Sequence, residues 1–431
     1  MPRADAKVAG DPRPRHKTRM DFPLDAVRAR FPALSVPGRI YFDAPGGTQV
    51  CAPAIARMVA HLETGTANAG GCFATSRDTD ALSDAAHAAM ADLLGGEPGE
   101  IAFGANMTTL TLAVGRALAR GWDEGDELVV TRLDHDANVA PWLQVAADRA
   151  MTVRWIDFDP VTGRLDLDAL PGLLGARTRL VAVGGASNAL GTVNDVAGIV
   201  RIVRARSAAL VFVDAVQLAP HGPVDVRALG CDLLACSPYK LFGPHQGVLW
   251  GRAALMRMLE AYKVRPASID PPAHRFETGT PSFEGQAGVL GSIDYLEWLG
   301  ERLSPGANGR RERLGAAMRG IAAYEEGLSA RMLDGLAGVP GLTLFGPAGV
   351  EGRVPTFAFT IAGHPPHVVA AHLAARGIFA WSGHFYAVEA IRRLGLKEAG
   401  GLVRVGLCHY NSADEVDRLV AALHALHSPG R

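Results

Sequence analysis

One lysine stands in a stretch whose residue types favour chemistry. The sequence SPYKLFGPHQG (237–247) places Lys240 among prolines, aromatic residues and glycines. The apolar runs LLAC (233–236) and GVLW (247–250) flank it, as buried strands would. Its amine either reaches water from a loop, or it is desolvated and attacks carbonyl groups, because burial lowers the pKa of an amine.

Asp214 is the second candidate residue. The apolar run LVFV (210–213) leads directly into it, so its carboxylate emerges at the end of a predicted buried strand. A buried charge is costly unless it is paired. One explanation is a helix N-cap, a position that aspartate favours. The interpretation that we favour is a partner for a cationic ring nitrogen, because a pyridoxal phosphate (PLP) site combines a Schiff-base lysine with such a carboxylate.

Further polar residues follow other predicted strands. Asn188, Gln217 and His135 each come shortly after an apolar run, which favours one shared site over separate loops. His135 lies between Asp134 and Asp136, so a metal contact and a loop histidine bonded to backbone are alternatives. No second cluster supports a metal, and we predict none. The favoured role is an imidazole stacked on an aromatic cofactor.

The elements that must position these residues form two patterns. Apolar runs alternate with predicted helices (167–174, 196–208), which is typical of an α/β fold with a mostly parallel sheet covered on both faces. In such sheets ligands bind beyond the carboxyl ends of the strands. After Gly285 a long helical region (293–336, broken at 305–308) leads into a smaller α+β unit, whose strands 342–345 and 356–361 alternate as half-buried strands do. A helix (366–376), a strand (402–406) and a last helix (412–426) follow. The sequence therefore predicts a disordered tail (1–20), a large PLP-binding domain (21–290) and a small C-terminal domain (291–431).

Composition bounds the class of protein. The chain has 431 residues, 48% hydrophobic and 20% charged, which indicates a globular chain of enzyme size with a large core. Its formal net charge of -1 provides no electrostatic attraction for nucleic acid or an anionic membrane. Five cysteines without CxxC spacing indicate neither a disulfide scaffold nor structural zinc, and favour a reducing, cytoplasmic location. The first twenty residues are basic and lack an apolar signal core, so we expect a solvated tail rather than a targeting arm.

Several motifs together resemble a known family. Asp214-x-x-Gln217, Ser187-Asn188-x-x-Gly191-Thr192, Ser237-x-x-Lys240 and Gly279-Thr280-Pro281 occur in the order seen in class V aminotransferases, which are PLP enzymes. The likeness runs from about Phe31 to Leu423 and is greatest to the branch of group II cysteine desulfurases and selenocysteine lyases. It implies the PLP-dependent transferase fold of type I and a homodimer.

The resemblance also implies a role for each matching residue. Lys240 would form the Schiff base with the coenzyme and move the substrate proton, while Asp214 pairs with the pyridinium nitrogen and His135 stacks on the ring. Asn188 and Gln217 would hydrogen-bond the ring hydroxylate. The phosphate would be bound by Ser237, Tyr239 and the helix start at Ala105, Asn106 and Met107, while Gly279 and Thr280 would reach the phosphate of the neighbouring subunit. Arg404 would bind the substrate carboxylate, and Ala44 would form part of the wall near the substrate.

The chain departs from the desulfurase pattern where sulfur would be accepted. The family's loop reads Gly-His-His-Cys, and here it reads Gly383-His384-Phe385-Tyr386. A phenol cannot accept sulfur as a thiolate does. Cys72 lies in another glycine-bearing loop, and we expect it to be a small buried apolar residue instead. The usual mechanism is therefore not expected.

One reaction step does not need that cysteine and is still expected: loss of the α-proton from an amino acid bound to the coenzyme. We rank the outcomes as C–S or C–Se lyase chemistry of a non-standard mechanism, then epimerisation, then transamination. Tyr386 and His384 are candidate general acids toward the leaving group. A non-catalytic binding protein that kept the fold is the alternative of another class.

Overall fold

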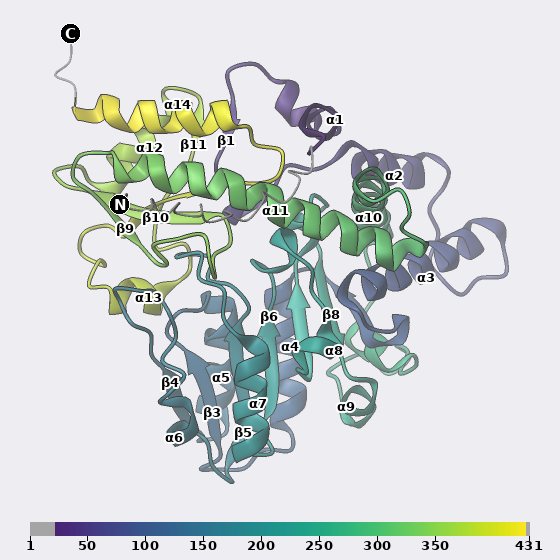
Figure 1. Ribbon diagram of the computed structural model, residues 1–431. Helices are drawn as coiled ribbons and strands as arrows, with labels where there is room; N and C mark the ends of the chain where they lie inside the picture. The colour runs from purple at the N-terminus through teal and green to yellow at the C-terminus, as the bar shows by residue number, and fades with distance from the viewer. Residues whose placement is uncertain (1–21, 428–431) are drawn as a thin grey trace, which may run out of the picture.

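A mixed sheet of seven strands forms the centre of the larger part of the molecule (Figure 1). The computed structural model describes residues 22–427, so the predicted tail (1–20) lies outside the described residues. β8 runs antiparallel to both of its neighbours, and the other strands are parallel to one another. In spatial order the strands are β2 (Ile101–Gly104), β8 (Gly247–Gly251), β7 (Leu233–Cys236), β6 (Leu210–Asp214), β5 (Thr178–Gly184), β3 (Glu127–Thr131) and β4 (Thr152–Ile156).

Helices cover both faces of this sheet, which explains why its strands read as continuous apolar runs. In β5, Val181 and Val183 pack into one hydrophobic cluster, whereas Leu180 and Ala182 pack into the other. The first face carries α3 (Ala74–Leu94), α7 (Val196–Arg206) and α10 (Phe283–Leu303), and the second carries α4 (Met107–Ala119) and α5 (Ala140–Asp148). The shorter or peripheral helices are α1 (Leu24–Arg28), α2 (Ala52–Glu63), α6 (Leu170–Leu173), α8 (Val226–Leu229) and α9 (Ala253–Met258).

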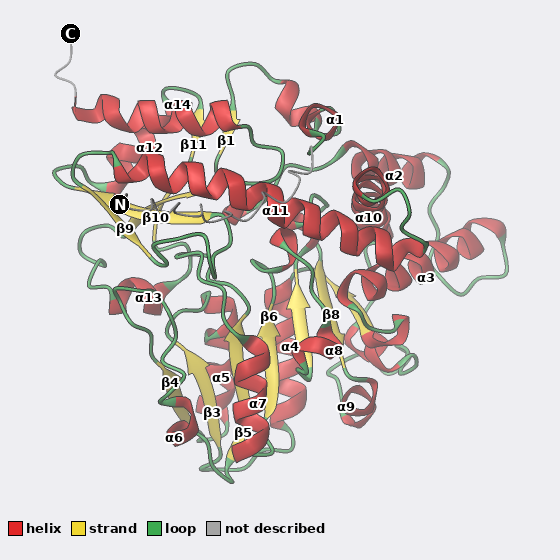
Figure 2. Ribbon diagram, viewed as in Figure 1, coloured by secondary structure: helices red, strands yellow, loops and turns green. Residues whose placement is uncertain are grey.

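A second, antiparallel sheet lies beyond the carboxyl ends of the parallel strands (Figure 2). Its order is β12 (Trp381–Gly383), β13 (Leu402–Gly406), β10 (Thr356–Ile361) and β9 (Leu342–Phe345). A parallel pair joins β1 (Ile40–Tyr41) to β11 (Ile378–Phe379), so an N-terminal segment packs with this C-terminal part. The accompanying helices are α11 (Gly309–Ala337), α12 (Pro366–Ala374), α13 (Val388–Arg393) and α14 (Ala413–His424).

Most predicted elements are present, with informative differences. The predicted break at 305–308 separates α10 from α11, but α10 begins ten residues before the predicted start at 293. The predicted boundary at residue 290 therefore falls inside a helix, and the division into domains stays a prediction. The expectation that 356–361 is half-buried was wrong: five of the six residues of β10 are buried, because it is an inner strand covered on both faces.

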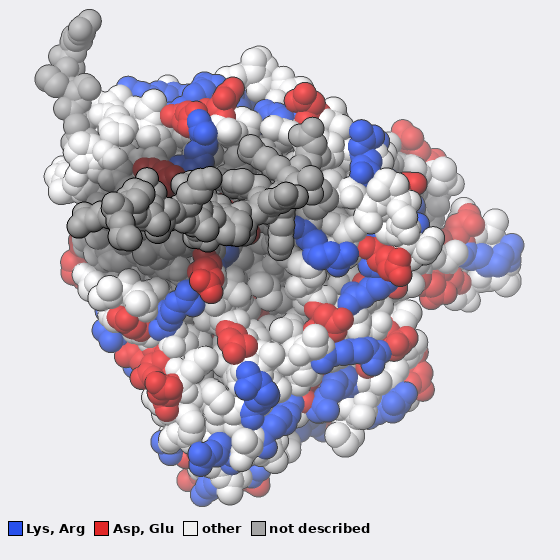
Figure 3. All heavy atoms as spheres, in the orientation of Figure 1, with Lys and Arg blue, Asp and Glu red and all other residues white. Residues whose placement is uncertain are grey.

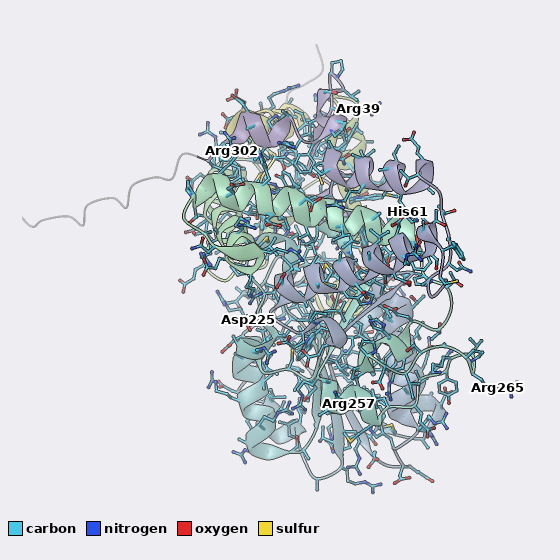
Figure 4. The ribbon with its side chains drawn as sticks, turned by 90° about the vertical axis from the view of Figure 1, so that its right-hand side faces the viewer. Arg39, His61, Asp225, Arg257, Arg265 and Arg302 are labelled. Atoms are coloured by element: carbon cyan, nitrogen blue, oxygen red, sulfur yellow. The ribbon has the colours of Figure 1, made fainter. Side chains whose placement is uncertain are left out.

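The visible surface carries both signs of charge. Basic and acidic side chains are interspersed on the face shown in Figure 3. Exposed arginines such as Arg257 and Arg265, in and after α9, lie on the outside of the molecule (Figure 4). Within residues 22–427 there is no helix with the length and apolar character needed to cross a bilayer.

Candidate active site

A cavity lies beyond the carboxyl ends of β3, β5, β6 and β7. Lys240 belongs to the short helical turn η6 (Pro238–Lys240) after β7, and only 5% of its surface is exposed. Its Nζ donates a hydrogen bond to Oε1 of Gln217, at 3.1 Å. Eight other predicted site residues line this cavity together with Lys240: Asn106, Met107, His135, Asn188, Asp214, Gln217, Ser237 and Tyr239.

The charges around Lys240 favour a reactive amine. Burial lowers its pKa, the Arg404 guanidinium lowers it further, and Asp214 opposes the change. Burial raises the pKa of Asp214 to about 6, while the N–H of Val216, 2.9 Å from Oδ1, and the Lys240 amine oppose the rise. The loop reading of Lys240, in which the amine reaches water, is wrong because η6 places the side chain in the interior.

His135 is a neutral ring in this environment. Burial lowers its pKa to about 3, and the charges of Lys240 and Arg404 contribute. Its Nδ1 accepts the N–H of Ala137 at 3.0 Å. The preceding Asp134, which the sequence did not single out for the site, is engaged by Thr131 (2.7 Å) and Asn138 (2.8 Å). Asp134 and His135 therefore have separate hydrogen-bond partners. The Asp134 carboxylate holds the loop through Thr131 and Asn138, whereas the His135 ring lines the cavity.

One end of the cavity suits a phosphate group. Asn106 is the N-cap of α4, and its side chain accepts the N–H of Thr109 at 2.9 Å. Met107 and Thr108 line the cavity in the first turn, where N–H groups lack intrahelical partners and the helix dipole favours an anion. Ser237 also lines this cavity.

The predicted phosphate contacts are not all in one place. Ala105, Gly279 and Thr280 line a second cavity and are not among the residues around Lys240. For Gly279 and Thr280 this separation agrees with the implied role in a neighbouring subunit, which stays a prediction.

A third cavity adjoins the first and shares four residues with it: His135, Asn188, Tyr239 and Lys240. Arg404 lines it from β13, which is an inner strand of the second sheet. Arg404 is 4% exposed, its Nη1 donates to the backbone oxygen of Asn188 at 2.9 Å, and burial lowers its pKa to about 9. Its guanidinium lies 4.3 Å from the centre of the Phe385 ring.

The loop that lines this third cavity is backbone-strained. Phe385 and Tyr386 have φ values of 54° and 59°, a region that non-glycine residues rarely adopt. The N–H of Tyr386 donates to Nδ1 of His384 at 3.0 Å, and its backbone oxygen accepts the N–H of Asp136 at 2.7 Å. The Tyr386 ring is 66% exposed and stacks on His135, with ring centres 5.5 Å apart. Tyr386 and His384 thus lie at the mouth of the site.

Two sequence expectations differ from the structure. Ala44 packs in the hydrophobic core, and its neighbours Pro45 and Gly46 line the third cavity. Cys72 is exposed, not buried, because the segment between α2 and α3 lies on the surface.

Two buried polar atoms indicate that both cavities accept ligands. Oδ1 of Asn188 and Nε of Arg404 have no hydrogen-bond partner within residues 22–427. Unpaired buried polar groups are costly, so a bound molecule is a natural partner for each. The Lys240 amine, the Asp214 carboxylate, the His135 ring and the α4 N-terminus fit an aldehyde, a pyridine nitrogen, an aromatic face and a phosphate respectively. The donor set therefore fits PLP.

Comparison with known proteins agrees with this geometry. The Aminotransferase class-V family matches residues 40–419, and the chain belongs to that family. It is 34% identical to a cysteine desulfurase of Dickeya dadantii over 435 residues, which cover 94% of this chain and 97% of the relative.

Solved structures establish the fold. The cysteine desulfurase of Thermococcus onnurineus NA1, 28% identical, superposes with a TM-score of 0.84 and covers 95% of this chain and 98% of its own. A C-DES variant with glycine covalently linked to its PLP cofactor is 20% identical and has a TM-score of 0.76, with coverage of 92% and 98%. The predicted α/β fold of the type I PLP enzymes is confirmed.

Proposed function

We propose that this chain is a PLP-dependent enzyme that acts on an α-amino acid as a C–S or C–Se lyase, by a mechanism other than persulfide transfer to a loop cysteine. The observation that carries the proposal is the position of Lys240. Its buried amine lines both the cavity that fits the cofactor and the cavity that contains Arg404. An amine shared in this way can serve the coenzyme on one side and the substrate on the other.

Each residue has a physical task in this proposal. When bound, PLP supplies an aldehyde for the Lys240 amine and an electron-withdrawing ring. Asp214 would supply a negative charge for the ring nitrogen, and His135, neutral because of its low pKa, would offer a flat face without adding charge. Arg404 holds the substrate carboxylate through two parallel N–H groups. The Lys240 amine would take a proton from the substrate.

The lyase outcome rests on the loop chemistry. The residues of this single chain that line the third cavity include Tyr386, His384 and Trp381, and no cysteine is among those described. A hydroxyl or imidazole can protonate a leaving group, whereas neither accepts sulfur as a thiolate does. Tyr386 and His384 are therefore proposed as general acids. Transamination or epimerisation is the second candidate, because both use the same Lys240 and Arg404.

Two further proposals concern assembly and location. A homodimer with shared sites would bring Gly279 and Thr280 of one chain to the phosphate of the other. We also propose that the enzyme acts on a small molecule in the cytoplasm and has no nucleic-acid or membrane partner.

Product analysis tests the reaction. The purified enzyme is incubated with L-cysteine, a cysteine conjugate or sulfoxide, selenocysteine, or an amino donor plus a keto acid. Pyruvate with ammonia supports elimination, alanine with released sulfur supports desulfuration, and a new amino acid supports transamination. A colourless protein that binds no PLP would instead favour a non-catalytic binding protein.

A further inference from the structure

Aromatic side chains surround the outer part of the third cavity. Trp381, Phe385 and Tyr386 line it together with Lys240 and Arg404. Trp381 is 54% exposed, and Tyr386 is more than half exposed as well. Large aromatic side chains usually bury most of their surface, so exposed rings that share a cavity point to a ligand with apolar surface of its own.

The register of the second sheet places Trp381 beside Arg404. The two residues are direct partners in the antiparallel pair of β12 and β13, so their side chains leave the sheet on the same face. Side chains that are opposed in this way start about 5 Å apart. An amino acid whose carboxylate is bound by Arg404 therefore has the Trp381 indole within reach of its side chain.

The neighbouring wall leaves room for the indole. A Cβ at Gly46 would lie 2.7 Å from Nε1 of Trp381, so a larger residue at this position would displace the ring. The Phe385 ring is already engaged, because the Arg404 guanidinium lies 4.3 Å from its centre. Trp381 and Tyr386 thus present the aromatic surface that is still available to a ligand.

The charges in this cavity do not suit a charged substituent. No aspartate or glutamate of residues 22–427 lines it, so a cationic group would find no carboxylate there. An anionic group would compete with the substrate carboxylate for Arg404. An apolar group loses little when it leaves water, and it gains contact with the two exposed rings.

The chemistry of the leaving group agrees with this choice. A desulfurase passes a sulfur atom to a nucleophilic acceptor, for which a thiolate is suited. Within the described part of the chain, no cysteine lines this cavity. Elimination instead releases the sulfur as a thiol, which needs no acceptor.

We propose that the third cavity binds the β-substituent of a cysteine or selenocysteine conjugate, an apolar group about the size of one ring, and that Trp381 selects such a conjugate over free cysteine. This inference rests on the proposed lyase function and names its substrate class. In the overall reaction, R–S–CH2–CH(NH3+)–COO− and water give RSH, pyruvate and ammonium. The Cβ–S bond breaks, and the sulfur leaves with the bonding electron pair and takes a proton, so neither an oxidant nor a reductant is needed.

The first test compares two analogues in which a carbon group replaces the sulfur. L-Homophenylalanine corresponds to S-phenyl-L-cysteine, L-2-aminobutanoate corresponds to L-cysteine, and neither carries a leaving group. By isothermal titration calorimetry with the PLP-loaded enzyme, we expect homophenylalanine to bind about 10- to 50-fold more tightly, because its ring buries apolar surface against Trp381 and Tyr386. Equal dissociation constants would overturn the inference, whereas an enzyme that binds neither analogue would refute the proposed function itself.

The second test assigns the selectivity to Trp381. Trp381→Ala should lower the ratio of the two dissociation constants about tenfold, and Trp381→Phe, which keeps a ring, should preserve most of it. Tyr262→Ala removes an exposed ring that follows α9 and is not among the residues that line the cavity, so it should leave the ratio unchanged. A ratio that Trp381→Ala does not alter would overturn the role of Trp381.

The same variant distinguishes substrate binding from assembly. If the exposed rings instead face a second copy of this chain, Trp381→Ala would change the oligomeric state and leave the ratio of dissociation constants unchanged. Size-exclusion chromatography at several protein concentrations measures the oligomeric state. That result, or faster release of pyruvate from L-cysteine than from S-phenyl-L-cysteine, would overturn the inference and leave the proposed lyase function in place.

Discussion

The two sides of the site are built differently. On the proposed cofactor side, Asp214 ends β6 and Lys240 follows β7, and both are less than a tenth exposed. On the substrate side, the loop that follows β12 carries an exposed Tyr386 and two residues with positive φ. Arg404 stands between them, buried on β13 but lining the outer cavity.

This difference distinguishes buried residues, whose type the fold restricts, from exposed loop residues, whose type can vary. A buried strand end can hold a charge only with a partner, so residues there are tied to one chemistry. An exposed loop can change residues without disturbing the core, and loops on a rigid scaffold commonly set specificity. We therefore expect changes on the cofactor side to alter the coenzyme's spectrum, and changes on the substrate side to alter reaction rates alone.

The largest effect is expected for Asp214→Asn. It removes the charge beside the ring nitrogen, and loss of one preorganised electrostatic contact typically lowers kcat about 100- to 1,000-fold. Steady-state product formation and the absorbance spectrum should change together. Asp195→Asn, at the exposed N-cap of α7, is the control. A near-normal rate in Asp214→Asn would contradict the expectation that changes around Asp214 have larger effects than changes in the exposed loop.

Arg404→Lys tests the residue between the two sides. A lysine loses the paired N–H groups that suit a carboxylate, so kcat/KM should fall by about 10- to 100-fold, mainly through KM. The coenzyme's absorbance should remain. Arg418→Lys, an exposed arginine of α14, provides the matched control. An unchanged KM would show that the substrate carboxylate binds elsewhere.

Tyr386→Phe tests the exposed loop. It removes only the phenol hydroxyl, and elimination should slow by about tenfold because water can partly replace an exposed general acid. The visible absorbance should not change, which distinguishes this variant from Asp214→Asn. Comparison with His384→Gln would identify which side chain protonates the leaving group. Unchanged elimination in both variants would discard that role.

The smallest effect concerns pH. A protonated amine does not attack an aldehyde, so the rate at which the cofactor-free protein takes up PLP should rise with pH and level off above the pKa of Lys240. Burial and Arg404 lower that pKa, so the midpoint should lie below the usual lysine value of 10.5. Arg404→Met should move it upward. Absorbance growth after mixing measures the rate, and a midpoint near 10.5 in the wild type would contradict the lowered pKa.

Local sequence signals predicted the cofactor side well and the rest less well. Continuous apolar runs identified β5, β6 and β7, and the polar residues that follow them meet in one cavity as predicted. The sequence gives no local signal for contacts between distant segments. For this reason the contact between His221 and Glu325, which are 104 residues apart, was not predicted.

The substrate loop was predicted only through family resemblance. Its residue types were noted, but the positive φ values of Phe385 and Tyr386 are unusual for bulky residues and could not be anticipated. Exposure was also misjudged for Cys72, because its residue type favours burial while its surface segment does not provide it.

The most direct test of the central claim is to locate the covalent attachment. The purified protein, loaded with PLP, is reduced with borohydride, digested and mapped by mass spectrometry. We predict a reduced phosphopyridoxyl group on the peptide that contains Lys240, and its loss in Lys240→Ala but not in Lys397→Ala. A label on another lysine, or no label on a protein that has bound PLP, would contradict the account.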